Sequence, residues 1–250
     1  MRKNHILTST FSLVLLASFF YGTAQEKKPV SDTVAVAITP VKTDRYGIRI
    51  GADISRPARA FYDKDFKGIE LVADYRLSKK IYAAAEVGTV DLRTEDDLLD
   101  FTTKGSYIKL GFDYNAYENW LDMENMIYTG IRYGFSSFSQ NLNSYTIYDP
   151  DNYFDDVVVS PNKKFSGLSA HWVEVIGGIK AELFDNLFMG FSVRLNILLT
   201  DKKPENFDNL YIPGFNRTYD GNFGVGFNYT LSYFIPLYKK HNEIPKEVKK

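Results

Sequence analysis

A serine, a histidine and a carboxylate that could cooperate in nucleophilic catalysis occur within a short segment, at Ser169, His171 and Glu174. Hydrolases use this combination to attack an ester or amide, with the histidine taking the serine proton and the acid orienting the histidine. In an extended chain Ser169 and His171 share one face, whereas Glu174 falls on the other. The segment therefore does not predict a ready-made triad, and we expect no catalytic residue.

Four aspartates lie close enough in the sequence to gather a calcium ion through their carboxylate oxygens: Asp149, Asp151, Asp155 and Asp156. Their spacing differs from that of an EF-hand calcium loop. Acidic loops are commonly solvated without a metal. We therefore predict neither a metal site nor a cofactor.

Aromatic residues accompany these aspartates within residues 136–170. Aromatic side chains mixed with polar residues suit recognition of a protein or a glycan. They can equally pack the segment onto its neighbours, and the sequence leaves both interpretations open. The candidates for recognition are Tyr145, Tyr148, Tyr153 and Phe154.

Alternation of apolar and polar residues is strongest in residues 187–199. The odd positions are all apolar, whereas the even positions include Gly190, Ser192, Arg194 and Asn196. A period of two indicates a strand with one apolar and one polar face. The segment is longer than an average soluble strand of about five or six residues, and a tilted strand crosses a bilayer with about nine to eleven. We expect the apolar face to contact lipid and the polar face to line a barrel.

Seven further segments alternate in a similar way. Their connections are short and long in turn, as periplasmic turns and extracellular loops are in bacterial barrels. A soluble sandwich has no reason to sort its loops by length. We therefore predict an all-β fold, an eight-stranded antiparallel up-and-down transmembrane β-barrel. The predicted strands are residues 45–55, 68–77, 81–90, 106–117, 126–135, 171–183, 187–199 and 222–235.

The polar faces of these strands carry charged residues of both signs, which we predict to line the lumen. An eight-stranded barrel is just wide enough for side chains to fill it, and buried charges are costly unless they are paired. A salt-bridge network that plugs the lumen is the simpler interpretation, and an ion or proton path gated by rearranging pairs remains an alternative. The predicted lumen residues are Arg49, Asp53, Glu70, Asp74, Arg76, Glu86, Lys109, Asp113, Arg132, Glu174, Lys180, Glu182 and Arg194.

One pair within this set can be predicted from strand register. Counting outward from the short turn at residues 184–186 places residue 194 opposite about residue 176. Glu174 then lies one same-face step from Arg194, a separation that long side chains can span. We therefore predict a Glu174–Arg194 ion pair in the lumen.

The start of the chain indicates an exported protein, and the segments that follow it can be assigned to a linker, a barrel and a tail. A basic start precedes an apolar run that ends in small residues, the layout of a signal peptide, so we expect residues 1–24 to be removed. Residues 25–44 predict a periplasmic linker, residues 45–238 the outer-membrane barrel, and residues 239–250 a charged periplasmic tail.

The composition narrows the class of protein. The formal net charge of −1 becomes −3 once the two basic residues Arg2 and Lys3 leave with the signal peptide, which argues against nucleic-acid binding. The chain has no cysteine, so no disulfide or lipoprotein anchor is expected. No second apolar segment is long enough for a spanning helix, so an integral membrane protein of this composition would use strands.

Glycines and polar residues at set places in the strands form a pattern of their own. They are Trp172, Glu174, Gly178, Lys180, Glu182, Gly190 and Arg194, together with the run Ile131-Arg132-Tyr133-Gly134. This pattern resembles an uncharacterised family of outer-membrane β-barrels typical of the Bacteroidota, known only as a domain of unknown function. The resemblance covers roughly residues 45–238. It implies a small OmpA/OmpX-like barrel of eight strands and no established activity.

From these features we expect a non-catalytic integral protein of the cell outer membrane, with a plugged lumen and a structural or binding role. The expected partners are outer-membrane lipid, an extracellular protein or glycan bound through residues 136–170, and a periplasmic partner bound through the tail. No nucleic-acid partner is expected. Two alternatives remain open: an accessory barrel subunit of an envelope or secretion complex, and a lipid-modifying enzyme at the rim, similar to a lipid A deacylase.

Overall fold

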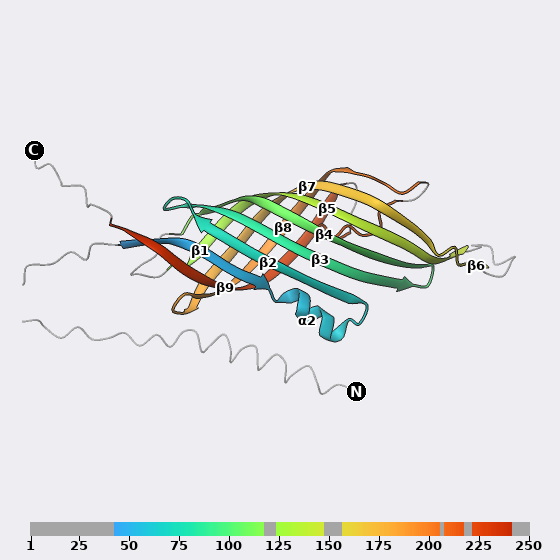
Figure 1. The fold of residues 1–250 in the computed structure, drawn as a ribbon, viewed down its shortest axis with the longest axis horizontal. Coiled ribbons are helices and arrows are strands. Elements are labelled where there is room, and N and C mark those ends of the chain that lie inside the picture. Colours follow the sequence, from blue (N-terminus) through green and yellow to red (C-terminus); the bar gives the residue numbers. More distant parts are fainter. Residues whose placement is uncertain (1–42, 118–123, 148–156, 206–207, 218–221, 242–250) are drawn as a thin grey trace, which may run out of the picture. The chain divides into compact units, whose positions relative to one another are not determined.

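Eight long strands, each antiparallel to its neighbours, close into a ring (Figure 1). The computed structural model describes residues 43–117, 124–147, 157–205, 208–217 and 222–241. The expected signal peptide and most of the expected linker and tail lie outside these residues. The eight-stranded antiparallel up-and-down barrel predicted from the alternation is confirmed.

The ring follows the order of the chain. Each strand pairs with the next, β9 closes the ring on β1, and among the described residues the short strand β6 pairs only with β5. The strands are β1 (Thr43–Asp53), β2 (Phe66–Arg76), β3 (Ile81–Asp96), β4 (Leu99–Asn115), β5 (Met126–Ile147), β6 (Val157–Val159), β7 (Lys163–Phe184), β8 (Leu187–Asp201) and β9 (Phe223–His241).

Four strands extend well beyond the bounds that alternation predicts. β3 continues to Asp96, β4 begins at Leu99, β5 continues to Ile147 and β7 begins at Lys163. Much of the connections expected at the long-loop end is therefore strand, and that part of the prediction is wrong.

The missed extensions have a common physical cause, which is a change in the face that carries the apolar residues. Within the predicted spans most of the apolar residues point outward. In the extensions Phe138, Leu142 and Leu168 are buried inside the ring, whereas Ser137 is exposed on the outside. A strand prediction that requires apolar residues on the outer face therefore stops where the apolar residues change to the inner face.

The last strand also differs from the prediction. Pro236 is expected to end it, but β9 continues to His241. Gly47 pairs with Pro236 and Tyr46 with Tyr238, so a β-bulge separates the two pairs. A bulge tolerates a proline because the missing N–H is not needed in the ladder. β1 likewise begins at Thr43, inside the expected linker.

An apolar belt covers the outer face of the strands. On every strand of the ring except β1 at its start, exposed aliphatic or aromatic residues alternate with buried ones. The outward residues of β9 show the pattern at its longest: Phe223, Val225, Phe227, Tyr229, Leu231, Tyr233 and Ile235, each between 38% and 62% exposed.

The connection between β8 and β9 folds back against the inside of the ring. Residues 211–215, which we call the plug, are all buried. The Ile212 carbonyl accepts the Phe215 N–H at 3.1 Å, and Gly214 has φ of 84°. With proline before that glycine, this is the geometry of a type II turn. The Phe215 ring packs edge to face on Trp172, with 6.0 Å between centroids.

The plug shares one apolar core with the inward residues of the long strands. This core fills the long-loop end of the ring, above the charged part of the lumen. Its buried members are Phe66, Val90, Leu92, Phe101, Tyr107, Phe138, Leu168, Ala170, Trp172, Leu198, Tyr211, Ile212 and Phe215.

A short helix, α2 (Ser55–Tyr62), follows β1 where the sequence predicts a loop. Pro57 lies in its first turn, where the missing N–H costs no intrahelical bond. At its end Arg59 Nη2 lies 2.8 Å from Asp63 Oδ2. None of the helix residues is buried. Among the residues that the structure describes, no helix is long and apolar enough to cross a membrane.

Candidate functional site in the barrel lumen

The thirteen charged residues that the alternation assigns to the lumen all lie on the inner face of the ring. All are buried except Lys180 and Glu182, which are half-buried. Seven strands supply them: Arg49 and Asp53 on β1; Glu70, Asp74 and Arg76 on β2; Glu86 on β3; Lys109 and Asp113 on β4; Arg132 on β5; Glu174, Lys180 and Glu182 on β7; and Arg194 on β8.

The centre of the lumen is a cluster of two carboxylates and two cations. Arg194 Nη1 lies 2.6 Å from Glu86 Oε2 and 2.9 Å from Glu174 Oε2. Lys109 Nζ lies 3.1 Å from Glu174 Oε1 and 3.5 Å from Glu86 Oε2. Each cation thus contacts both carboxylates, which is the arrangement that makes buried charge tolerable.

The network continues toward the short turns through alternating charges. Arg132 Nη2 lies 2.8 Å from Asp113 Oδ1. Asp74 is shared, with Lys180 Nζ at 2.6 Å and Arg49 Nε at 3.0 Å. These contacts join β1, β2, β4, β5 and β7, so the network ties together most of the ring.

Charged residues that the sequence reasoning missed complete the network at the turn end. Arg76 Nη1 lies 3.1 Å from Glu124 Oε2, and Arg45 Nη2 lies 3.3 Å from Glu182 Oε1. Arg45 has the same parity as Arg49, so alternation could have found it. Glu124 lies in a predicted turn, where periodicity says nothing about direction.

The top of the network meets the apolar core through polar tips of its aromatic residues. The Tyr107 hydroxyl donates to Glu70 Oε2, and Trp172 Nε1 donates to Glu174 Oε1 at 2.7 Å. Arg56 on α2 also reaches Glu70, with 3.0 Å between Nη2 and Oε2. Arg56 and Tyr107 were not predicted as site residues. Tyr107 shares the parity of the inward residues of β4, whereas Arg56 lies in a predicted loop.

Little space remains between these side chains. A cavity of about 30 Å³ is lined by Arg49, Asp74, Glu86 and Arg194, among others. On this measure a cavity needs about 10–15 Å³ to hold one water. The cavity therefore has room for about two waters, which is less than a hydrated ion needs.

The candidate triad is not assembled. His171 lies on the outward side of β7, where its Nδ1 is 2.7 Å from the Tyr133 hydroxyl and its ring is 4.8 Å from that of Phe135. Glu174 is buried in the lumen and occupied by Arg194. The acid and the histidine thus lie on opposite faces of the wall.

The loop candidates are described only in part. Tyr145 lies on β5, half-buried, opposite Val159 of β6. Tyr148, Tyr153, Phe154 and the four aspartates lie outside the described residues. Among the residues that are described, no group of three or more histidine, aspartate or glutamate side chains could hold a metal ion.

Comparison with known proteins assigns a family. The model of a family described as "Domain of unknown function (DUF6048)" matches residues 6–240. The chain belongs to this family. The expected relationship to an uncharacterised domain-of-unknown-function family is thereby confirmed. No curated protein matches the chain.

A solved structure shows a remote likeness. The chain is similar to Ail, the attachment invasion locus protein of Yersinia pestis, with 12% sequence identity and a TM-score of 0.37. The match covers 76% of this chain and 97% of Ail. The strand pairing of this chain, and not this likeness, establishes the barrel.

Proposed function

We propose that the protein is a non-catalytic integral β-barrel of the cell outer membrane, closed to ions and solutes, with a structural or binding role. The observation that carries the proposal is the polarity of the wall. Apolar residues face outward and paired charges face inward, the reverse of a soluble barrel.

The outward belt supports the membrane placement. Large apolar side chains such as Ile131, Phe227 and Val193 are about half or more exposed, at 61%, 62% and 49%. Soluble monomers rarely expose contiguous apolar surface of this kind. In a bilayer the same residues would contact hydrocarbon, and the closed ring leaves most backbone groups paired, as lipid requires.

Two layers support a closed lumen. The lower layer is the salt-bridge network centred on Arg194, and the upper layer is the apolar core built around the plug. Water would have to displace both layers to pass. The alternation of strong ion pairs across the lumen makes such displacement costly, because separated charges would be left buried and unpaired.

The rim supports a binding role. β5 and β7, each of 22 residues, continue beyond the belt, and β5 pairs there with β6. The proposal includes cleavage of the signal peptide after residue 24 and display of residues 136–170 outside the cell. It also includes an origin of the family in the Bacteroidota. The geometry of His171, hydrogen-bonded to Tyr133 and walled off from Glu174, supports a rim without catalysis.

Membrane insertion tests the proposal. The purified chain should float with liposomes and should migrate differently on electrophoresis before and after boiling, as closed membrane barrels do. Recovery of the folded chain in the soluble fraction, without detergent, would contradict it.

A further inference from the structure

The barrel wall has a notch between β9 and β2 at the long-loop end. β1 pairs with β9 only as far as Asp53 opposite Thr230, and the last backbone bond runs from Ile54 N–H to Tyr229 O at 2.7 Å. β9 continues to Phe223 with only β8 beside it among the described strands. β2 likewise runs on to Phe66 with only β3 beside it.

This notch leaves backbone groups of β9 without a strand partner. The Tyr229 N–H donates to Asp53 Oδ1 at 3.2 Å, and its carbonyl accepts from Ile54. Alternate residues of a strand present their backbone groups to the same edge. Phe227 and Val225 are therefore next on the open edge, and no described strand pairs with them there. Hydrocarbon does not tolerate an open sheet edge, so a polar group has to cover this one.

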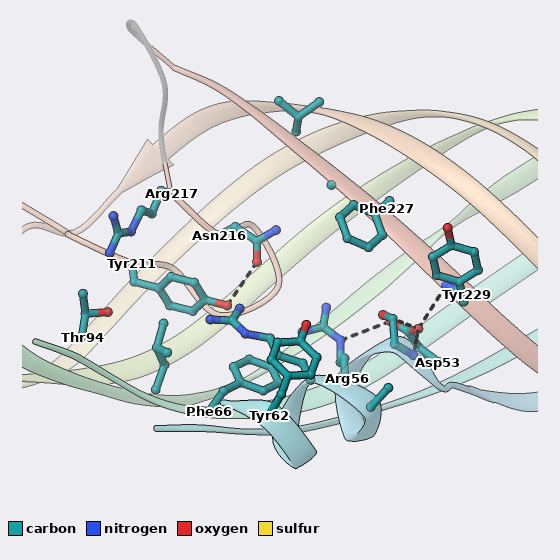
Figure 2. A pocket seen from close by; sticks show the side chains of 16 residues that line it. Asp53, Arg56, Tyr62, Phe66, Thr94, Tyr211, Asn216, Arg217, Phe227 and Tyr229 are labelled. Atoms are coloured by element: carbon teal, nitrogen blue, oxygen red, sulfur yellow. Dashed lines mark hydrogen bonds and ion pairs between the residues drawn. The ribbon is translucent and has the colours of Figure 1, made fainter. Parts of the chain in front are cut away.

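A cleft of about 520 Å³ occupies the notch (Figure 2). Helix α2 forms one side of the cleft, and β9 forms another. The third side is formed by residues of the connection between β8 and β9, among them Arg217. Figure 2 shows Arg56 on the helix side, Arg217 on the connection between β8 and β9, and Phe227 and Tyr229 on β9. Burial raises the pKa of Tyr211 in the same cleft, so its hydroxyl stays protonated and donates to Asn216 Oδ1 at 3.1 Å.

Three arginines border the cleft, and one of them has no carboxylate partner among the residues that the structure describes. Arg56 is held by Glu70 at 3.0 Å and by Asp53 at 3.5 Å. Arg59 contacts Asp63 but stays 39% exposed. Arg217 is exposed and forms no ion pair with any carboxylate that the structure describes. Two accessible guanidinium groups therefore border a cleft in the membrane wall.

The cleft is continuous with the apolar belt. Val225, Phe227 and Tyr229 line it, and the same residues are 54%, 62% and 44% exposed on the outer face of β9. At the helix end, Phe61 and Tyr62 are 91% and 79% exposed, as suits residues at a membrane interface. A ligand seated on the arginines would therefore reach the belt without crossing the wall.

We propose that this notch binds a membrane lipid with an anionic, phosphate-bearing headgroup. The inference rests on the membrane placement proposed above. The phosphate accepts bonds from Arg59, Arg217 and the open edge of β9, and the acyl chain follows Val225 and Phe227 into the belt. A soluble anion would leave the apolar surface uncovered. Hydrocarbon alone would leave the Arg217 guanidinium group and the open backbone N–H groups of β9 unpaired.

Native mass spectrometry of the mature chain in neutral detergent micelles tests this. Dioleoyl phosphatidic acid should bind one site at least about tenfold more tightly than dioleoyl phosphatidylcholine, because the choline cation neutralises the phosphate of phosphatidylcholine, whereas phosphatidic acid keeps its net negative charge for the arginines. Arg59→Gln with Arg217→Gln should weaken phosphatidic acid binding about tenfold or more. Equal affinity for the two lipids, or an unchanged affinity in this double variant, would overturn the proposal.

A matched control removes the same charge elsewhere on the rim. Lys104 pairs with Asp91 at 2.8 Å, as Arg59 pairs with Asp63, and Lys164 is exposed on β7. Lys104→Gln with Lys164→Gln should leave the affinity unchanged. An equal loss in this control would show general attraction to positive charge and would also overturn a specific site.

A last arm distinguishes a lipid from a free anion. Phe227→Asn should weaken binding of phosphatidic acid, and inorganic phosphate at equal concentration should not displace the lipid. Displacement by phosphate, with no effect of Phe227→Asn, would assign the cleft to a soluble anion.

Liposome flotation of the same proteins distinguishes failure of this inference from failure of the proposed function. Insertion without preference for phosphatidic acid overturns this inference alone, whereas failure to insert overturns the proposed function.

Discussion

Arg194 on β8 and Glu86 on β3 lie on diametrically opposite strands of the ring, yet Arg194 Nη1 is 2.6 Å from Glu86 Oε2. The same guanidinium nitrogen lies 2.9 Å from Glu174 Oε2 on the adjacent strand β7. One side chain therefore spans the lumen and is anchored on both sides. A lumen crossed in this way at mid-height is filled by its own walls.

Breaking this anchor should destabilise the barrel. Glu174→Gln leaves the charges of Arg194 and Lys109 less compensated, and loss of one buried partner costs about 3–5 kcal/mol. We expect the free energy of unfolding, measured by urea titration in phospholipid or detergent, to fall by an amount near this range. Adding Arg194→Met should recover part of the loss.

A surface pair supplies the control for that experiment. Arg93 Nη2 and Glu95 Oε2 lie 2.9 Å apart with both side chains about half exposed or more. Glu95→Gln should change the free energy of unfolding by no more than about 1 kcal/mol. If Glu174→Gln costs no more than Glu95→Gln, the lumen pairs do not stabilise the fold.

The plug should contribute as a buried core does. Phe215 is fully buried against Trp172, so Phe215→Ala should lower the free energy of unfolding by about 3–5 kcal/mol. The exposed control Glu95→Gln should change it by no more than about 1 kcal/mol. Equal effects would show that residues 211–215 rest on the mouth without sealing it.

How much of this structure the sequence predicts depends on which face of each strand carries the apolar residues. Where apolar residues stay outside, the period of two identified the eight strands of the ring, though not the short β6, and it placed all thirteen charged residues on the inner face. It also supported the register, because Ile176 pairs with Arg194 and Glu174 lies one step away. Strand geometry alone is enough for such inferences.

Alternation could not predict the parts that depend on tertiary packing. The strand extensions switch their apolar face, as Phe138 and Leu168 show. The plug residues Tyr211, Ile212 and Phe215 are buried in a core that they share with β2, β3, β4, β5, β7 and β8, and no local period predicts this. Glu124 joins the network from a turn, and Pro236 occupies a bulge that only the pairing of β1 with β9 reveals.

The orientation of the barrel in the membrane can be predicted from its connections, because the short ones and the long ones lie at opposite ends. We expect an epitope inserted at Asn152, between β5 and β7, to be labelled on intact cells, because this connection lies at the long-loop end. An epitope at Asp185, in the turn between β7 and β8, should be labelled only after the outer membrane is permeabilised. The opposite pattern would reverse the orientation of the barrel.

Rim catalysis should be absent. His171 Nδ1 contacts the Tyr133 hydroxyl and the acid nearest in sequence lies inside the lumen, so His171→Ala should leave the envelope lipids unchanged by mass spectrometry. Ser169→Ala should behave alike. A lipid species that shifts in the same direction in both variants would show that the rim is an active site.

Conductance tests the central claim most directly. The wild-type chain, reconstituted into a planar bilayer after its insertion has been verified, should show no steady current, because Arg194 and its partners fill the lumen beneath the plug. A steady, large single-channel conductance from the inserted protein, with the free energy of unfolding unchanged in Glu174→Gln and Arg194→Met, would contradict the closed barrel and establish a pore.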